Sequence, residues 1–127
     1  MAGLYGKGAR AERELVQHFS SLGFCVIRAA GSGVNSLSPD LLIFKRGIQY
    51  AIESKAHETL NLAISKDQFE NLQKWEEITG ITPLIAWKVN RQGWKFLHLS
   101  LFSKNEKSYS ISLENAWRMG KNLEEIG

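Results

Sequence analysis

The sequence is poor in cysteine and proline, and it contains no long apolar run. Its one cysteine, Cys25, cannot form a disulfide within the chain, and its place between Phe24 and Val26 predicts a reduced core residue rather than a nucleophile. No apolar run approaches the ~18 residues of a membrane-spanning helix, and residues 1–8 contain no apolar signal-peptide segment. We therefore expect a cytoplasmic protein without a membrane partner.

Length and composition are those of one globular domain. The 127 residues allow a single core, and two prolines with no repeat or low-complexity segment offer few points of division, so one domain is expected over 1–127. Hydrophobic residues make up 43% and charged residues 23%, which excludes disordered, collagen-like and coiled-coil chains.

The net charge of +3 is concentrated in the first part of the chain. Residues 1–55 carry seven basic and four acidic side chains, whereas residues 56–127 carry nine of each. An anionic partner such as nucleic acid is therefore expected to dock on the first half.

Apolar periodicity and turn residues predict an α/β chain in the order αβββαββα. Helices are predicted over 7–22, 66–79 and from 113 to about 125, and strands over 24–30, 40–45, 48–54, 82–89 and 94–101. Segment 31–39 consists of turn-forming residues, so we expect a mobile loop there. The strands would form a central mixed five-stranded sheet flanked by helices.

The predicted first helix carries a carboxylate on its apolar face. Glu12 precedes Leu15 by three residues and Val16 by four, which places it on the stripe that these side chains form. A buried, unpaired carboxylate is costly, so Glu12 in that position needs a cation, a metal ion or water. The alternative is a first-turn surface glutamate that the helix dipole favours.

The hairpin formed by strands 40–45 and 48–54 brings two further carboxylates together. If Arg46 and Gly47 are its turn, Asp40 lies opposite Glu53, and such neighbours have Cβ atoms roughly 5 Å apart. Like charges repel there unless a cation lies between them. Lys55 shares their face, two residues after Glu53. These oxygen ligands suit Mg²⁺, for which Mn²⁺ can substitute, and the alternative is a set of solvated charges at strand ends.

The spacing of these residues is that of a known nuclease motif. Pro39-Asp40, twelve further residues and then Glu53-Ser54-Lys55 form the PD-(D/E)xK pattern of the restriction-endonuclease-like nucleases. In order and spacing the chain resembles the archaeal Holliday-junction resolvase family over about residues 7–90, through segments 7–8, 12–16, 23–24, 28–33, 39–41, 52–55 and Gln68. The resemblance implies a restriction-endonuclease-like core and a metal-dependent, homodimeric nuclease.

The resemblance also implies roles for residues that match the family's motifs. In the family, the positions of Glu12, Asp40, Glu53 and Lys55 form the active centre, and the position of Ser32 is important for catalysis. A divalent cation would thus be bound by Glu12, Asp40 and Glu53, with Lys55 beside it.

Gln68 matches the family as well, and its role is open between two alternatives. Within Ser65-Lys66-Asp67-Gln68 it can complete a capping box, in which its side chain satisfies the Ser65 backbone amide. The other alternative is a catalytic role near Lys55.

Basic side chains of the first half are predicted to bind DNA phosphates, and so to recognise shape rather than base sequence. The resemblance implies this role for Arg10 and Arg28. The full set of predicted DNA-binding residues is Lys7, Arg10, Arg13, Arg28 and Ser32.

The resemblance, together with these residues, implies an endonuclease of DNA recombination and repair that hydrolyses phosphodiesters at four-way DNA junctions. A homodimer is expected, because a junction has approximate two-fold symmetry and needs paired cuts; no organic cofactor is expected. The alternatives are another nuclease of the superfamily that cuts ends, flaps or damaged DNA, and a non-catalytic DNA-binding module. The intact Asp40, Glu53 and Lys55 argue against the latter, since unused carboxylates repel DNA.

Overall fold

The computed structural model describes residues 2–29 and 38–126, with side chains described from Gly8 onward. Its helices are α1 (Ala2–Ser21), α2 (Lys66–Thr79) and α3 (Leu113–Met119), and it has two short 3₁₀ turns, η1 (Leu99–Leu101) and η2 (Leu123–Glu125). Its strands are β1 (Cys25–Arg28), β2 (Leu41–Lys45), β3 (Ile48–Ala56), β4 (Asn61–Ser65), β5 (Thr82–Val89), β6 (Gly93–His98), β7 (Ser103–Lys104) and β8 (Ser108–Ser112). Most of the predicted loop 31–39 lies outside the described residues.

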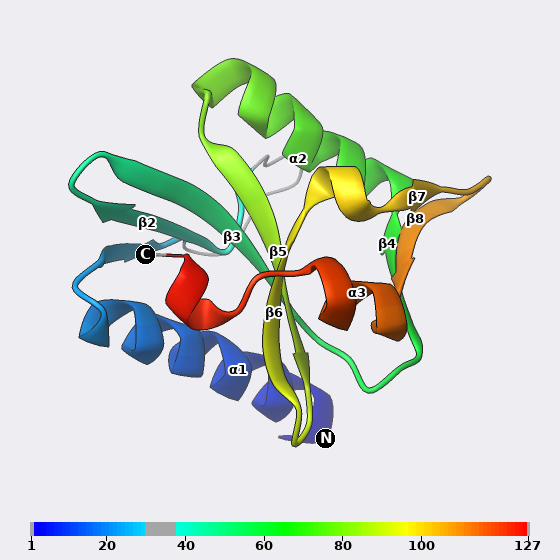
Figure 1. Ribbon diagram of the computed structural model, residues 1–127, viewed down its shortest axis with the longest axis horizontal. Coiled ribbons are helices and arrows are strands. Elements are labelled where there is room, and N and C mark those ends of the chain that lie inside the picture. The colour runs from blue at the N-terminus through cyan, green and yellow to red at the C-terminus, as the bar shows by residue number, and fades with distance from the viewer. Residues whose placement is uncertain (1, 30–37, 127) are drawn as a thin grey trace.

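A mixed five-stranded sheet in the strand order β1-β2-β3-β5-β6 forms the centre of the molecule (Figure 1). β3 and β5 run parallel, with Ile52 beside Leu84, whereas the other neighbouring strands are antiparallel. The parallel pair requires a crossover, which contains α2. The predicted α/β class with a mixed five-stranded sheet is therefore confirmed.

The β2–β3 hairpin turns through Arg46 and Gly47, whose φ angles are both positive, at 48° and 87°. Two central residues with positive φ are typical of the tight turn that matches the twist of a hairpin. The turn pairs Leu42 with Ala51, which is the register derived from the sequence. The hairpin prediction is confirmed, and its register decides which residues meet at the far end of the two strands.

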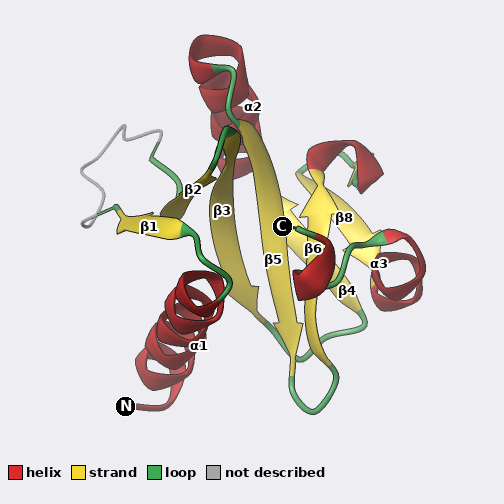
Figure 2. Cartoon of the chain, turned by 60° about the vertical axis from the view of Figure 1, so that its left-hand side comes forward, coloured by secondary structure: helices red, strands yellow, loops and turns green. Residues whose placement is uncertain are grey.

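The sheet is covered on both faces, and its strands alternate between two cores. On β5, Leu84 and Ala86 pack in one core with Leu15 and Phe19 of α1, whereas Trp87 belongs to the other core, with residues of α2 and α3. Figure 2 shows α1 on one side of β3 and β5, and α3, β4 and β8 on the other. The position of a residue along β3 or β5 therefore decides which layer its side chain meets.

A second sheet, of three strands in the order β4-β8-β7, is absent from the predicted order of elements. It pairs Leu62 of β4 with Ile111 of β8, and both side chains are buried in the core that contains α2. β4 pairs with β8 across a long stretch of chain, and β7 is only two residues long, so local periodicity does not reveal this sheet. The predicted order αβββαββα is wrong in this respect.

Two predicted elements end earlier than expected. The strand predicted over 94–101 is β6 only as far as His98, after which the chain turns through η1. The helix predicted to reach about residue 125 ends at Met119. The cause is an isolated bridge between Lys121 and Phe96, whose two backbone hydrogen bonds of 2.8 and 2.9 Å draw the chain along β6.

The other helices lie close to their predicted positions. α2 has the predicted bounds, because the Ser65 side chain caps its N-terminus and Gly80, at φ 74°, ends it in a left-handed conformation. α1 begins at Ala2, earlier than predicted. No helix among the described residues combines the length and the apolar character that a membrane crossing demands.

Cys25 is exposed, so its predicted place in the core is wrong. β1 lies at the edge of the five-stranded sheet. Side chains alternate along a strand, and here the preceding residue, Phe24, is the one that turns into the α1 core.

We predict that Gly47→Ala lowers the free energy of unfolding by about 1 kcal/mol, because a Cβ disfavours the positive φ of this turn. A Cβ built at Gly47 meets nothing within 4 Å, so the cost comes from the backbone and not from a clash. Urea denaturation measures the change. Gly47→Asn is the matched control, because asparagine tolerates this conformation, and an equal loss in both variants would contradict the explanation.

Candidate active site

The predicted catalytic carboxylates meet where β2 begins and β3 continues past it. The last β2–β3 pair is Leu41 with Ile52, so Asp40 follows beside Glu53. The Asp40 backbone N–H donates to the Glu53 carboxylate, and the Ser54 backbone N–H donates to Oδ2 of Asp40 at 2.8 Å. The hairpin thus holds the two carboxylates side by side, as its register required.

Gln68 connects the acidic and basic residues of this cluster. Its Nε2 donates to Oε2 of Glu53 at 2.8 Å, and its Oε1 accepts from Nζ of Lys55 at 2.9 Å. Glu53 and Lys55 lie beside Ile85 and Trp87 of β5, whose side chains belong to the core that contains α2. Alternation along β3 therefore turns both toward the helix that carries Gln68.

The backbone and the side chain of Gln68 make separate contacts. The Gln68 backbone N–H donates to Oγ of Ser65 at 3.2 Å, which is the N-cap half of the predicted motif. The Gln68 side chain, however, is engaged with Glu53 and Lys55. The structure thus places the Gln68 side chain beside Lys55, while Ser65 caps α2 without a reciprocal contact from that side chain. A catalytic role for Gln68 stays a prediction.

Burial raises the pKa of both carboxyl groups, and neighbouring carboxylates add to the effect. Glu53 is 9% exposed, and burial, followed by the charge of Asp40, raises its pKa from 4.5 to about 7, against the opposing effect of Lys55. Burial is also the main cause that raises the pKa of Asp40, with Glu12 adding to it while the Ser54 N–H and Lys55 oppose it. Each carboxylate is thus short of compensating positive charge.

Glu12 reaches this region from α1, on the other side of the sheet. It sits on the predicted inward stripe, next to the buried Ala11 and near Leu15 and Phe19, and its side chain is 21% exposed. Its Oε2 accepts from Nε of Arg28 at 3.2 Å. Arg28 therefore supplies the positive charge that an inward-facing Glu12 is expected to need.

The donor set fits a hard divalent cation, with two protein ligands in place. Asp40 and Glu53 offer carboxylate oxygens, which Mg²⁺ and Mn²⁺ prefer, and a cation would relieve the charge that raises the pKa of both groups. In the part of the chain that the structure describes, no three Asp, Glu, His or Cys side chains are grouped to hold a metal ion. Further positions would fall to water or phosphate oxygens, as is usual for Mg²⁺.

Two pockets flank the end of β3 beside this cluster. One, of about 450 Å³, is lined by Gly8 and residues 54–59, including Lys55. The other, of about 270 Å³, is lined by residues that include Arg10, Lys88 and Asn90. Ala56 and Glu58 line both, so the pockets adjoin along the chain that follows Lys55.

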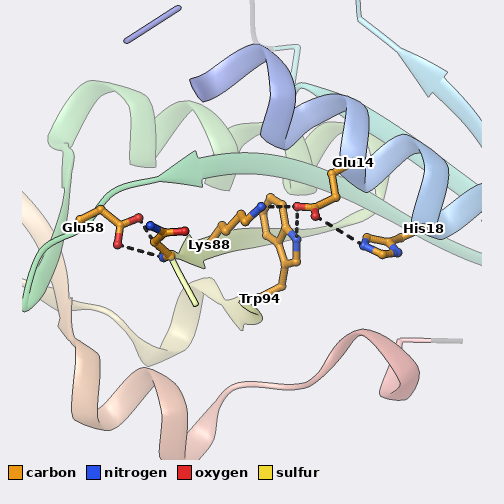
Figure 3. A network of polar contacts seen from close by, with 6 residues as sticks. Glu14, His18, Glu58, Lys88 and Trp94 are labelled. Carbon is orange, nitrogen blue, oxygen red and sulfur yellow. Dashed lines mark hydrogen bonds and ion pairs between the residues drawn. The ribbon is translucent and has the colours of Figure 1, made fainter. Parts of the chain in front are cut away.

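Lys88 is a residue of this region that the sequence analysis missed. Its ammonium pairs with Glu14 of α1, which also accepts from Nε1 of Trp94 at 3.1 Å (Figure 3). Lys88 lies beside Ala56 in the parallel β3–β5 register, one position after Trp87 beside Lys55. Only this pairing of β3 with β5 brings Lys88 to the region, and a single sequence does not reveal a pairing between such distant strands.

The structure describes the side chains of some predicted DNA-binding residues and not of others. Arg10 lines the second pocket, Arg13 is exposed on α1, and Arg28 is exposed at the end of β1. Lys7 belongs to α1, but its side chain lies outside the described part. Ser32 lies outside the described residues, so its predicted role stays a prediction.

Comparison with known proteins gives consistent matches over almost the whole chain. The archaeal Holliday junction resolvase (Hjc) family matches residues 4–126. The crossover junction endodeoxyribonuclease Hjc of Archaeoglobus fulgidus is 32% identical over 121 residues, covering 94% of this chain and 88% of that protein. The protein of the same name from Methanocaldococcus jannaschii is 37% identical over 108 residues, covering 84% of this chain and 77% of its own.

Solved structures show the same relationship. The structure of Archaeoglobus fulgidus Hjc has a TM-score of 0.85 at 29% identity, with 94% of each chain covered. A bacterial homing endonuclease has a TM-score of 0.56 at 14% identity, covering 99% of this chain and 87% of its own, and shares the fold alone.

We predict that Glu53→Gln stabilises the metal-free protein increasingly as the pH rises. The unfolded chain ionises Glu53 near pH 4.5, whereas the folded protein keeps the proton until about pH 7. The stability that this raised pKa contributes is complete below the unfolded value and is lost as the pH passes through the folded one. Between pH 4.5 and 8 the unfolding free energy of the variant should gain about 3 kcal/mol relative to wild type.

Denaturation in EDTA across this pH range measures the difference. The matched control is Glu106→Gln, which removes an exposed carboxylate between β7 and β8. A pH-dependent gain of the same size in the control would show that the burial of Glu53 is not its cause.

Proposed function

The chain belongs to the archaeal Holliday junction resolvase (Hjc) family and is a crossover junction endodeoxyribonuclease, and from that premise we propose which of its residues perform the cleavage. Asp40 and Glu53 hold a divalent cation, Mg²⁺ or in its place Mn²⁺. Lys55 and Gln68 complete the catalytic centre. The observation that carries the proposal is the chain of contacts from Asp40 through Glu53 and Gln68 to Lys55.

The chemistry that a divalent cation supplies at such a site is polarisation of the scissile phosphate and a lower pKa of the attacking water. Lys55 places its ammonium beside the same phosphate, where it stabilises the negative charge that develops as water attacks. Gln68 fixes both Glu53 and Lys55, so neither side chain has to be ordered during the reaction. Glu12 contributes a further carboxylate from α1.

The DNA reaches this centre along a basic surface. Arg10 and Arg13 are exposed on α1 and Arg28 is exposed at the end of β1, and they bind phosphates together with Lys7. Contacts of this kind fix the position of the backbone and read no base sequence, which suits an enzyme that selects a four-way junction by its shape.

We predict that Asp40→Asn abolishes cleavage of a synthetic four-way junction in Mg²⁺ while leaving junction binding intact or tighter. The substitution removes a metal ligand and a charge that repels phosphate. Cleavage is measured on labelled junctions, binding by gel shift in EDTA, and the linear duplex of the same sequence gives the junction selectivity.

Asp67→Asn is the matched control, since Asp67 is exposed in the first turn of α2 and should leave cleavage near the wild-type rate. Removal of a catalytic group is expected to slow cleavage by ~10²-fold or more. If Asp40→Asn instead cleaves within tenfold of the wild-type rate, the proposed metal site is ruled out. Equal cleavage of junction and duplex by the wild type would contradict the junction preference.

Gln68→Ala should lower the cleavage rate by about 10- to 100-fold, the range found when a group that orients a metal ligand is removed. In this variant the Ser65 side chain still accepts from the backbone N–H of residue 68, so the cap of α2 is retained. Ser65→Ala is the complementary variant: it removes the cap, costs about 1 kcal/mol of stability and should leave cleavage almost unchanged. The reverse pattern would show that Gln68 acts only through the helix.

We predict a homodimer, because paired cuts on two strands of a junction need two active centres and each chain contains one such cluster among its described residues. Equilibrium sedimentation at micromolar concentration should give twice the 14.3 kDa mass of one chain. A monomer, both free and bound to a junction, would contradict this arrangement.

A further inference from the structure

Arg28 is predicted to bind a DNA phosphate, but its side chain already binds the carboxylate of Glu12. In this DNA-free structure its Nε donates to Oε2 of Glu12 at 3.2 Å. The Arg28 side chain is nevertheless 60% exposed. A guanidinium has five N–H donors, so the N–H groups of Arg28 that do not bind Glu12 can donate to a phosphate, which then competes with the carboxylate or replaces it.

Glu12 lies near the catalytic carboxylates without being grouped with them. Arg28 lies opposite Leu41 in the β1–β2 register, and the Ala29 backbone N–H donates to the Asp40 carbonyl oxygen at 3.0 Å. The arginine that binds Glu12 is therefore next to the strand end that carries Asp40. Among the described residues, however, Glu12, Asp40 and Glu53 do not form a group able to hold a metal ion. The contact that occupies Glu12 is the one with Arg28, which joins α1 to the end of β1.

We propose that Arg28 is a positioning residue that holds Glu12 away from the metal site until a DNA phosphate takes its place, so that DNA binding releases Glu12 as a third ligand beside Asp40 and Glu53. This inference rests on the proposed function of Asp40 and Glu53. Its consequence is thermodynamic coupling: junction DNA tightens metal binding, and metal tightens DNA binding by the same factor.

Arg28 opposes metal binding in the free protein because it occupies the Glu12 carboxylate, which would otherwise be available to bind the ion. Removing Arg28 should therefore strengthen metal binding when no DNA is present, although Arg28 is itself predicted to bind DNA.

The test is a titration of the DNA-free protein with Mn²⁺, followed by calorimetry at pH 8.5, which is above the pKa of about 7 of Glu53. Arg28→Ala should bind Mn²⁺ roughly fivefold or more tightly than wild type. Arg28→Gln, which keeps much of the side-chain stem, should do the same. Arg118→Ala, which removes a remote exposed cation of α3, should leave the affinity unchanged.

A double-mutant cycle shows whether Arg28 acts through Glu12. In a Glu12→Gln background, Arg28→Ala should no longer tighten Mn²⁺ binding. Conversely, Glu12→Gln should tighten metal-free junction binding in EDTA when Arg28 is present, and do so less when Arg28 is alanine. Equal effects in both backgrounds would overturn the proposal, because Arg28 and Glu12 would then act independently.

The same titration separates failure of this inference from failure of the proposed function. If Asp40→Asn weakens Mn²⁺ binding and Arg28→Ala leaves it unchanged, the metal site stands and the role of Arg28 is wrong. If Asp40→Asn leaves Mn²⁺ binding unchanged, the metal site itself is wrong and the inference fails with it.

Discussion

The burial of two carboxylates side by side is the constraint on which the rest of this site depends. Asp40 and Glu53 repel each other, and burial removes the water that would screen them. The protein opposes this cost with backbone N–H groups on both side chains, Gln68 on Glu53 and the charge of Lys55 nearby. What remains is a place where the folded chain gains from binding positive charge.

The layers of the fold explain how so many groups converge there. β3 supplies Glu53 and Lys55 on the face toward α2, and α2 supplies Gln68 from its first turn. α1 supplies Glu12 from the other side of the sheet, and β1 supplies the arginine that binds it. The proposed centre is therefore assembled from α1, the five-stranded sheet and α2, so its geometry depends on the packing of both helices against the sheet.

The parts of this arrangement that follow from short-range rules were predictable from the sequence. A turn at Arg46 and Gly47 fixes a register, and the register places Asp40 beside Glu53 whatever the rest of the chain does. The role of Gln68 was harder, because its position permits both a cap and a bridge, and only the path of β3 past α2 selects the bridge. Pairing between strands far apart in the chain could not be predicted from local sequence patterns. Such pairing forms the second sheet and brings Lys88 to the end of β3. Cys25 is a different case. Its apolar neighbours predict a buried side chain, but alternate residues of an edge strand face solvent, and Cys25 is one of them.

The exposure of Cys25 has a practical consequence. It is the one thiol of the chain, and it lies on the same short strand as Arg28, three positions before it. A maleimide fluorophore or spin label would therefore attach at a single, known place without any engineered substitution. A reporter at that place would sense movement of the strand that carries Arg28, and in a two-chain assembly a pair of such labels would measure the separation between the two copies of β1.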